Sequence, residues 1–293
     1  MKFAIYGQFY HKNSKTSIAA LLDFLQKKDC DIYVEDDFFN MIKHEDDIEK
    51  DYHFKTFNTL DPSFDALISI GGDGTILRAV TFIKDLGIPI IGINTGRLGF
   101  LATIQKDEIE SALSEILKGN YKISKRSLLS IDTTNPSKEL EELNFALNEI
   151  AVSRKNTTSM ITVETILDGE YLTSYWADGL IVSTPTGSTG YSLSCGGPVI
   201  TPSANNFVLT PIAPHNLNAR PLVIPDSTEI KLKVSGREES YLVSLDSRLV
   251  TLKNNTIITI KKAPFSIKMI ELEKESFLDT LRKKLLWGED RRN

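Results

Sequence analysis

The sequence predicts an α/β N-terminal domain with a parallel sheet, followed by a mostly β C-terminal domain of two packed sheets. In the first third, short apolar runs alternate with segments whose apolar residues recur at helical spacing, a pattern typical of a parallel sheet covered by helices. After Tyr121 the chain changes to β-branched, alternating segments separated by turn residues. We expect domains over residues 1–120 and 121–271, and a C-terminal helix within 272–293 that packs back on the first domain.

Four strands and three helices are expected in the first domain. The strands are short, rich in branched residues and bounded by Gly, Pro, Asp or Asn, over 3–6, 32–34, 66–70 and 90–93. Helical spacing of apolar residues predicts helices over 18–25, 75–86 and 109–117, the last ended by Gly119. The acidic region from Glu35 to Asp51 has the least regular pattern, so we expect a surface excursion there.

Seven strands are expected in the second domain, over 128–131, 149–153, 161–167, 179–183, 230–234, 241–245 and 256–261. Turn signals separate several of them, among them Asp168-Gly169 and Asn254-Asn255. Near the C-terminus, Ser276 is a candidate cap for a helix with apolar residues on one face, and Gly288 follows its predicted end.

Composition excludes several classes of protein. The chain has 293 residues, 41% of them apolar, with 34 basic and 39 acidic residues and a net charge of −5. Without a basic stripe, a nucleic-acid partner is disfavoured. Cys30 and Cys195 lack CxxC spacing, so neither a zinc site nor a disulfide framework is suggested. The N-terminus is too polar for a signal peptide and no apolar run is long enough to span a bilayer, so we expect a cytoplasmic protein.

The four histidines are His11, His44, His53 and His215, and none lies at metal-ligand spacing from another. A zinc site built by the protein is therefore not expected.

The strongest local motif is the glycine-rich turn from Gly71 to Thr75, between a predicted strand and a predicted helix. Backbone N–H groups of Gly71, Gly72, Gly74 and Thr75 at a helix N-terminus can approach a phosphate closely. The motif is neither a P-loop nor the spaced dinucleotide fingerprint. Asp73 lies among the glycines, where it is a candidate base or magnesium partner; the alternative is an ordinary helix cap.

A second polar loop, from Asn94 to Leu101, follows the next predicted strand. Loops that leave adjacent carboxyl ends of a parallel sheet converge on one crevice, so we expect this loop and Asp73 to face the same ligand. Arg78 lies one turn into the helix and is within reach of the same place; alone, it would be a solvated surface cation.

A third segment, from Ala177 to Pro198, is rich in hydroxyls and glycines that suit a polar ligand. Tyr191 adds a flat surface for stacking. A hydrolase elbow at Ser188 fails because Thr186 stands where the first glycine belongs. Asn148-Glu149, just before a predicted strand, places an amide beside a carboxylate, a pair suited to ribose or base edges.

With these four elements in this order, the chain closely resembles the bacterial NAD kinases over nearly its whole length. The glycine-rich turn alone is shared with diacylglycerol, sphingosine and phosphofructokinase-type kinases, whereas the combination is specific. The resemblance implies phosphorylation of the adenosine ribose 2′-hydroxyl of NAD by ATP with Mg²⁺, yielding NADP. It also implies a homo-oligomer, commonly a tetramer.

The resemblance assigns roles to individual residues. Asp73 is at the position of the base, and the glycine-rich turn and Asn94 are expected near phosphates. The positions expected to contact NAD are Asp73, Gly74, Arg78, Asn148, Glu149, Asp178, Thr189, Gly190, Tyr191, Ser192, Leu193, Ser194 and Ala213.

The chain also departs from the family pattern. Gly190 and Cys195 stand where alanine is usual, which should leave the pocket open. Trp176 replaces a residue that is often basic, so an ionic contact there is expected to be absent or replaced by stacking. Asp246-Ser247-Arg248 stands where the family often has Asp-Gly-Gln, so the NAD contact of that glutamine is not expected here.

Two alternative functions stay open at this point. A lipid kinase with the same glycine-aspartate turn is disfavoured by the hydroxyl-rich run and by Asn148-Glu149, which suit a polar dinucleotide better than an acyl chain. A dinucleotide sensor without catalytic activity is the alternative from a different class.

Overall fold

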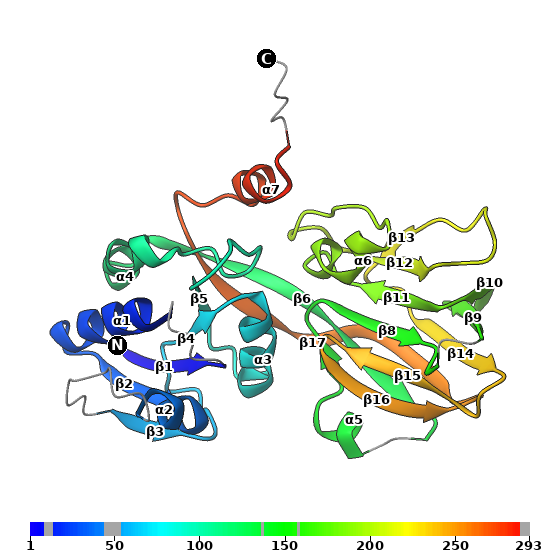
Figure 1. Ribbon diagram of the computed structural model, residues 1–293, viewed down its shortest axis with the longest axis horizontal. Helices are drawn as coiled ribbons and strands as arrows, with labels where there is room; N and C mark the ends of the chain where they lie inside the picture. Colours follow the sequence, from blue (N-terminus) through cyan, green and yellow to red (C-terminus); the bar gives the residue numbers. More distant parts are fainter. Residues whose placement is uncertain (9–13, 44–53, 136–137, 157–158, 288–293) are drawn as a thin grey trace. The chain divides into compact units, whose positions relative to one another are not determined.

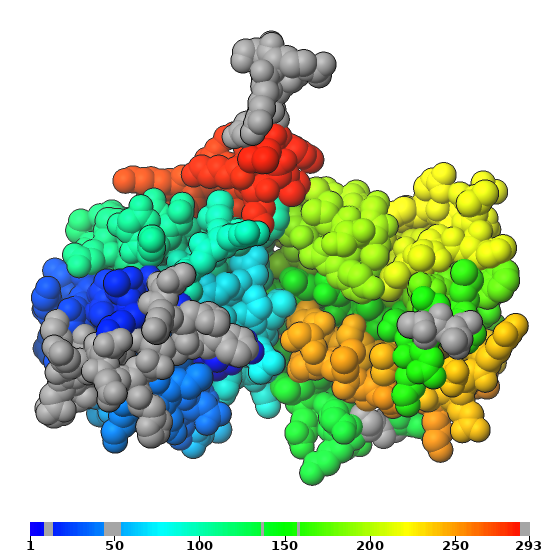
Figure 2. Space-filling model, viewed as in Figure 1, coloured from blue at the N-terminus to red at the C-terminus, as the bar shows by residue number. Residues whose placement is uncertain are grey.

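The structure is a computed structural model that describes residues 1–8, 14–43, 54–135, 138–156 and 159–287 (Figure 1). The chain forms two compact units, one of Met1–Lys125 with Ile267–Asn293 and the other of Arg126–Ser266. The long strands β6 (Tyr121–Thr133) and β17 (Ile257–Leu272) carry the chain from one unit to the other. In the space-filling view the first unit runs from blue to teal and continues in red, and the second runs from green to orange (Figure 2).

The first unit contains a parallel sheet with the strand order β5-β4-β1-β2-β3. Its strands are β1 (Lys2–Gly7), β2 (Asp31–Glu35), β3 (Lys55–Phe57), β4 (Ala66–Gly71) and β5 (Ile90–Asn94). Successive strands move outward from β1 to β3, and β4 then returns to the other side of β1. The strand order therefore reverses between β1 and β4, which is where open α/β sheets bind ligands at their carboxyl ends.

Helices cover both faces of this sheet. They are α1 (Lys15–Lys27), α2 (Asp36–Lys43), α3 (Asp73–Ile83) and α4 (Ile109–Leu117), the last preceded by a short 3-10 turn, Lys106–Glu108. Alternate strand residues such as Phe3 and Ile5 pack against Leu22 of α1 and Leu113 of α4 in one buried cluster. The predicted α/β class of the first domain is confirmed, because strand periodicity of two and helix periodicity of 3.6 bury the same apolar residues.

The expected surface excursion from Glu35 to Asp51 is wrong over its first part. Asp36–Lys43 forms α2, whose Phe38 and Ile42 join the core of the first unit. The buried carboxylate of Glu35 accepts a hydrogen bond from the Phe38 N–H at 2.9 Å and thereby satisfies the first turn. The acidic composition obscures the helical spacing of these two apolar residues, which become buried only when the helix packs on the sheet. Residues 44–51 lie outside the described residues.

The second unit consists of antiparallel strands in two sheets, which confirms the predicted β class. One sheet has the order β13-β12-β11-β8-β15-β16, and the other contains β10-β9-β14-β17, with β6 pairing β17 and β7. The apolar faces of the two sheets form one buried cluster that includes Val152, Leu180, Phe207 and Tyr241. The strands are β7 (Phe145–Ala146), β8 (Glu149–Ser153), β9 (Ile161–Leu167), β10 (Glu170–Ala177), β11 (Gly179–Ser183), β12 (Asn206–Ile212), β13 (Leu222–Pro225), β14 (Ile230–Gly236), β15 (Ser240–Leu245) and β16 (Arg248–Lys253).

Three of these strands, β10, β13 and β16, are sheet edges that the sequence patterns do not identify. In β10 only Tyr175 and Ala177 are buried, and in β13 only Ile224 is, so neither shows a clear apolar alternation. These strands form because they hydrogen-bond to a neighbouring strand. A local sequence pattern does not show which neighbour that will be.

The remaining helices are short. They are α5 (Lys138–Glu142), the 3-10 turn Gly187–Thr189, α6 (Tyr191–Ser194) and α7 (Phe277–Leu285). Ser276 caps α7 as predicted, its Oγ accepting the N–H of Asp279 at 3.1 Å. Gly288, the predicted residue after this helix, lies outside the described residues.

Within the first unit, α7 contacts the segment that follows β5. The rings of Phe277 and Phe100 lie 6.3 Å apart between centroids, and Thr103 donates to Glu275 at 3.0 Å. Lys284 also donates to the carbonyl of Leu98. These contacts fix the segment from Leu98 to Thr103 from one side.

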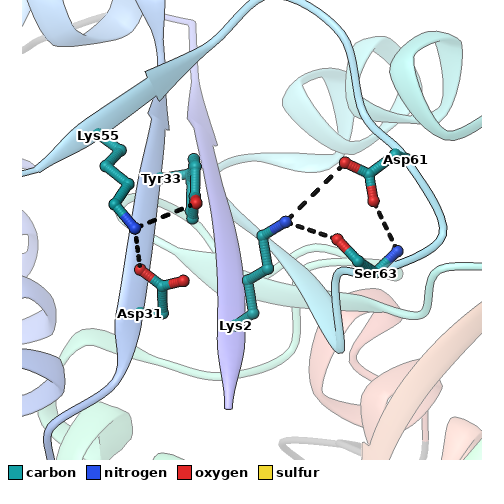
Figure 3. Close-up of polar contacts among 6 residues, drawn as sticks. All are labelled: Lys2, Asp31, Tyr33, Lys55, Asp61 and Ser63. Atoms are coloured by element: carbon teal, nitrogen blue, oxygen red, sulfur yellow. Dashed lines mark hydrogen bonds and ion pairs between the residues drawn. The ribbon is translucent and has the colours of Figure 1, made fainter.

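Polar side chains tie together the amino-end edge of the parallel sheet (Figure 3). Lys55 at the start of β3 contacts Asp31 at 3.1 Å and the Tyr33 hydroxyl at 3.3 Å, while Lys2 donates to Ser63 at 2.5 Å and lies 3.9 Å from Asp61. In a parallel sheet all amino ends lie on one side and all carboxyl ends on the other. This network is therefore remote from the carboxyl ends of β4 and β5.

Among the residues described, no helix is both long enough and apolar enough to cross a lipid bilayer.

Stability is expected to depend on the buried cluster rather than on the edge network. Leu113 is fully buried between α4 and the sheet, so Leu113→Ala should lower the free energy of unfolding by about 2–5 kcal/mol. The urea midpoint of Lys55→Met should equal that of the parent protein within error, because the Lys55–Asp31 pair is exposed to solvent. Urea unfolding followed by circular dichroism checks both; a larger loss in the Lys55 variant would contradict this ranking.

Candidate functional site

The glycine-rich turn joins β4 to α3 and presents open backbone at the helix N-terminus. Gly72 is the N-cap residue in an extended conformation, and its N–H donates to Thr75 Oγ1 at 3.4 Å. Gly71 has φ +156°, and a Cβ there would lie 2.3 Å from Thr75 Oγ1, so packing requires this glycine. A Cβ on Gly72 or Gly74 would meet nothing within 4 Å. These two glycines leave space beside the positive end of the helix dipole, where an anion is favoured.

Asp73 binds three consecutive backbone amides of the segment after β5. Its Oδ2 accepts the N–H of Phe100 at 2.8 Å, and its Oδ1 accepts those of Leu101 and Ala102 at 3.0 and 2.9 Å. The N-cap of α3 is Gly72, so the interpretation of Asp73 as the helix cap is wrong. A carboxylate has about four acceptor positions. The three described bonds therefore leave Oδ2 with room for one further donor.

Gly99 makes this arrangement possible. A Cβ at Gly99 would lie 2.0 Å from Asp73 Oδ1 and 2.6 Å from its Cγ. Any side chain there would displace the carboxylate, so the glycine before Phe100 is required by the close approach of Asp73 to the backbone.

Asn94 shapes the same segment from its beginning. Its buried amide donates to the carbonyls of Arg97 and Ala102 at 2.8 and 3.4 Å, and its Oδ1 accepts the Gly96 N–H at 2.7 Å. The Thr95 N–H donates to the Gly71 carbonyl at 3.1 Å. The structure thus brings the two loops together, as adjacency of β4 and β5 predicts, but it uses the Asn94 side chain inside its own loop.

Arg78 is exposed on α3. Burial raises the pKa of Tyr6, at the end of β1, and the positive charge of Arg78 opposes that rise. Arg78 therefore lies close enough to the carboxyl end of β1 to act electrostatically there.

In the second unit, Asn148 and Glu149 lie where β7 passes into β8, and Asp246 holds their backbone. The Asp246 carboxylate accepts the N–H groups of Leu147, Asn148 and Glu149 at 3.0, 2.8 and 3.2 Å. The Asn148 carbonyl accepts the Thr184 N–H at 2.9 Å, which fixes the start of the hydroxyl-rich segment. The sequence patterns assign no role to Asp246. The one local feature that could have indicated its role is its position as an aspartate in a turn between two strands.

The side chains of Asn148 and Glu149 have buried acceptor atoms without partners. Among the described residues, Asn148 Oδ1 and Glu149 Oε2 are buried and make no hydrogen bond. A Cβ on Gly190 would lie 3.2 Å from Glu149 Oε2 and 3.4 Å from Asn148 Nδ2. Burial and the charge of Asp246 raise the pKa of Glu149 to about 8, opposed by the Tyr191 backbone N–H that donates to it. Unpaired buried acceptors of this kind are costly unless a ligand satisfies them.

The hydroxyl-rich segment satisfies many of its own polar groups. Ser188 is fully buried, donating to the Pro185 carbonyl at 2.7 Å and accepting the Ile200 N–H at 2.9 Å. Ser192 is also buried and lies 2.8 Å from the Thr210 hydroxyl, while Thr189 donates to the Thr186 carbonyl at 3.2 Å. These hydroxyls build the frame of the segment.

Other predicted positions of the second unit face solvent. Tyr191 is 44% exposed, Ser194 is exposed, and Leu193 and Gly190 are half-buried. Asp178 pairs with Arg154 at 2.9 Å. The Tyr191 ring is therefore accessible from solvent, whereas the Ser192 side chain is not.

Two residues left without a role by the sequence contact each other. The rings of Trp176 and His215 lie 4.3 Å apart between centroids, and the His215 N–H donates to the Trp176 carbonyl at 2.8 Å. Ala213, two residues before His215, is exposed and has φ +42°. Trp176 therefore makes an aromatic contact with His215. His11, His44 and His53 lie outside the described residues.

These features define a protein of an α/β unit and a β unit, with an open glycine-rich turn at a helix N-terminus on the first and unpaired polar atoms on the second. The family model for the ATP-NAD kinase N-terminal domain matches residues 3–121, and that for the ATP-NAD kinase C-terminal domain matches residues 147–272. The chain belongs to the NAD kinase family.

Relatives match along the whole chain. It is 63% identical to an NAD kinase of Christiangramia forsetii and 61% identical to one of Flavobacterium psychrophilum, with 100% of each chain covered. Among solved structures, an NAD kinase from Archaeoglobus fulgidus in complex with ATP has a TM-score of 0.75 at 28% identity, covering 98% of this chain and 99% of that one. Yeast NADH kinase complexed with NADH has a TM-score of 0.86 at 23% identity, covering 99% and 88%, which shows the shared fold.

The bonds to Asp73 predict a local effect that needs no substrate. Asp73→Asn removes the charged acceptor of the Phe100, Leu101 and Ala102 amides, worth about 1.5–3 kcal/mol for a hydrogen bond to a charged group. Amide hydrogen exchange at these three residues should therefore become about 10- to 100-fold faster. Asp85→Asn, at an exposed aspartate just after α3, is the matched control and should change nothing there. Unchanged protection in the Asp73 variant would show that the segment is held by other contacts.

Proposed function

We propose that this chain phosphorylates the 2′-hydroxyl of the adenosine ribose of NAD, using ATP and Mg²⁺, and so produces NADP. The proposal is supported by family membership and by whole-length relatives named NAD kinase at up to 63% identity. The structural observation on which it rests is Asp73, a carboxylate held by three amides beside the open backbone of Gly72 and Gly74.

In the proposed reaction, Asp73 accepts the proton of the ribose 2′-hydroxyl as that oxygen attacks the γ-phosphorus of ATP. The bond from the γ-phosphorus to the β,γ-bridging oxygen breaks, and ADP leaves. Phosphoryl transfer depends mainly on in-line positioning and on neutralising phosphate charge. The amides of Phe100, Leu101 and Ala102 keep the carboxylate in one orientation before substrate arrives, so no binding energy is needed to order it.

The backbone at the start of α3 is proposed to receive phosphate oxygens. Gly72 and Gly74 have space where a Cβ would be, and Gly71 and Thr75 set the turn that exposes them. Asn94 contributes indirectly, by shaping the loop that holds Asp73.

Mg²⁺ is proposed to enter with ATP, bound by the phosphates. The described residues contain no group of three or more His, Cys, Asp or Glu side chains placed to hold a metal ion. Mg²⁺ usually keeps several waters and binds substrate phosphates rather than a cage made entirely of protein ligands. When bound, Mg²⁺ supplies neutralisation of the phosphate charge.

The positions that the resemblance assigns to NAD are proposed to bind it. Asn148 and Glu149 offer their unpaired buried acceptors to nucleoside groups, and Tyr191 offers an exposed ring for stacking. The further positions in the proposal are Gly74, Arg78, Asp178, Thr189, Gly190, Ser192, Leu193, Ser194 and Ala213. For Ser192 a contact would have to come from the backbone, since its hydroxyl is buried against Thr210.

Assembly as a homo-oligomer, with the tetramer as the expected form, derives from the resemblance alone. A location in the cytoplasm is proposed from the sequence and not from the resemblance.

Incubation of the purified protein with NAD, ATP and Mg²⁺ tests the activity, with NADP measured by a coupled dehydrogenase. Formation of NADP supports the proposal. Binding of NAD without NADP formation would instead identify a dinucleotide sensor, and turnover of a diacylglycerol or a sphingoid base alone would identify a lipid kinase.

The base role of Asp73 predicts a loss confined to turnover. Asp73→Asn should reduce kcat by at least about a hundredfold, the range for general base catalysis, while the Kd for NAD changes far less. Thr103→Val is the comparison, because it removes a loop contact to Glu275 but keeps the carboxylate. It should reduce kcat much less than the Asp73 variant does. Equal losses in the two variants would assign Asp73 to holding the loop only.

The exposed ring of Tyr191 predicts a loss confined to binding. Tyr191→Ala should weaken NAD binding by about 1–3 kcal/mol, the range for stacking of a base on an aromatic side chain. Tyr191→Phe keeps the ring and should bind as the parent does. Isothermal titration calorimetry measures both, and an unchanged Kd in the alanine variant would remove Tyr191 from the binding surface.

A further inference from the structure

Asp246 organises the backbone that presents Asn148 and Glu149. It lies in the turn between β15 and β16 with φ +54°, a left-handed conformation that is uncommon for a residue with a side chain. Its carboxylate accepts three consecutive amides, from Leu147 to Glu149, and its own N–H donates to the Glu149 carbonyl at 2.9 Å. Four hydrogen bonds from one residue therefore define where the side chains of Asn148 and Glu149 begin.

Arg248 extends this support to the preceding strand. Its guanidinium donates to the carbonyls of Leu143, at 2.9 Å, and Phe145, and lies over the Phe145 ring at 5.4 Å. The aspartate and the arginine of the Asp246-Ser247-Arg248 turn thus both bind the chain that leads to Glu149, where the family pattern often has a glutamine instead of the arginine.

A negative charge on the Asp246 carboxyl disfavours a negative charge on the Glu149 carboxyl. Burial raises the pKa of both groups, but three amides and the charge of Arg248 oppose the rise at Asp246. Glu149 has one opposing amide, that of Tyr191, and the charge of Asp246 adds to its rise, to a pKa of about 8. The other titratable group that faces it is the Tyr191 hydroxyl on α6. The three amides and Arg248 therefore favour the negative charge on Asp246 over one on Glu149.

We propose that Asp246 is a positioning residue that holds Glu149 as a neutral acid, so that Glu149 can both donate and accept a hydrogen bond with a bound nucleoside group. The proposal rests on the proposed function, since the ligand is taken to be NAD. A neutral carboxyl places a donor beside an acceptor and matches a nucleoside group that has both, a sugar hydroxyl or an aminopurine edge. An ionised carboxylate is an acceptor only, and it is costly to bury without a partner.

The affinity for NAD as a function of pH tests the protonation of Glu149. The folded-state pKa is raised, so the binding form is fully present below pH 8 and is lost as the pH rises through that value. The Kd of the parent protein should be constant from pH 6.5 to 7.5 and should rise about tenfold per pH unit above 8. Glu149→Gln keeps a donor and an acceptor but has no titrating proton, so its Kd, whatever its value at pH 7, should stay flat to pH 9.

Asp246→Asn tests the positioning role. The Asp246 charge contributes to the raised pKa of Glu149, so its removal should lower that pKa and move the midpoint of the profile to lower pH. Loss of the carboxylate acceptor should also raise Kd at pH 6.5 by at least about tenfold. A purely structural role would raise Kd equally at every pH and leave the midpoint unchanged. Ser247→Ala, at the exposed neighbour in the same turn, is the matched control and should reproduce the parent profile.

Three results would overturn the inference: a flat profile in the parent, the same slope in Glu149→Gln, or an unmoved midpoint in Asp246→Asn. Circular dichroism establishes that each variant is folded; if Asp246→Asn fails to fold, the comparison of the parent with Glu149→Gln still decides. NADP formation by the parent is measured in the same preparations. A protein that makes NADP but shows a flat profile refutes this inference alone, whereas one that binds NAD and makes no NADP refutes the proposed function.

Discussion

The candidate site of the first unit depends on one carboxylate that binds three backbone amides in a row. Without Asp73, the segment after β5 would expose the N–H groups of Phe100, Leu101 and Ala102 with no strand or helix to satisfy them. The contact also explains the neighbouring sequence: Gly99 admits the carboxylate, Gly71 admits Thr75, and Asn94 closes the loop onto itself. A negative charge at the first residue of α3 is favoured by the helix dipole, so the residue that holds the loop also stabilises its own helix.

The second unit repeats this device with different elements. Asp246 binds the amides of Leu147, Asn148 and Glu149, again three in a row and again across a long sequence separation. Each carboxylate accepts from a loop that leaves or enters a buried strand, where backbone groups outside the sheet need partners. In both units charge-assisted hydrogen bonds to one carboxylate, rather than apolar packing, fix the polar backbone of the candidate site.

The two carboxylates differ in what they leave available. Asp73 retains an acceptor position on Oδ2 beside open glycine backbone, which suits a proton-accepting role next to phosphates. Asp246 is half-buried, its carboxylate accepts three amides, and its charge acts on Glu149. Two neighbouring carboxyls with little solvent are costly to charge together, and the one that accepts three amides is the better placed to hold the charge.

The sequence by itself determined the two fold classes, the positions of most buried strands and helices, and the glycine-rich turn, because strand and helix periodicity and glycine placement are local properties. It also placed Asp73 and the loop of Asn94 at the same sheet edge, since neighbouring parallel strands end together. Only the tertiary structure decided that Asn94 and Ser192 use their polar groups internally, that the region after Glu35 begins with a helix, and that Asp246 supports Glu149. Those outcomes depend on which backbone amides lack partners after the sheets have formed, and that is a property of strands distant in sequence, which no local pattern records.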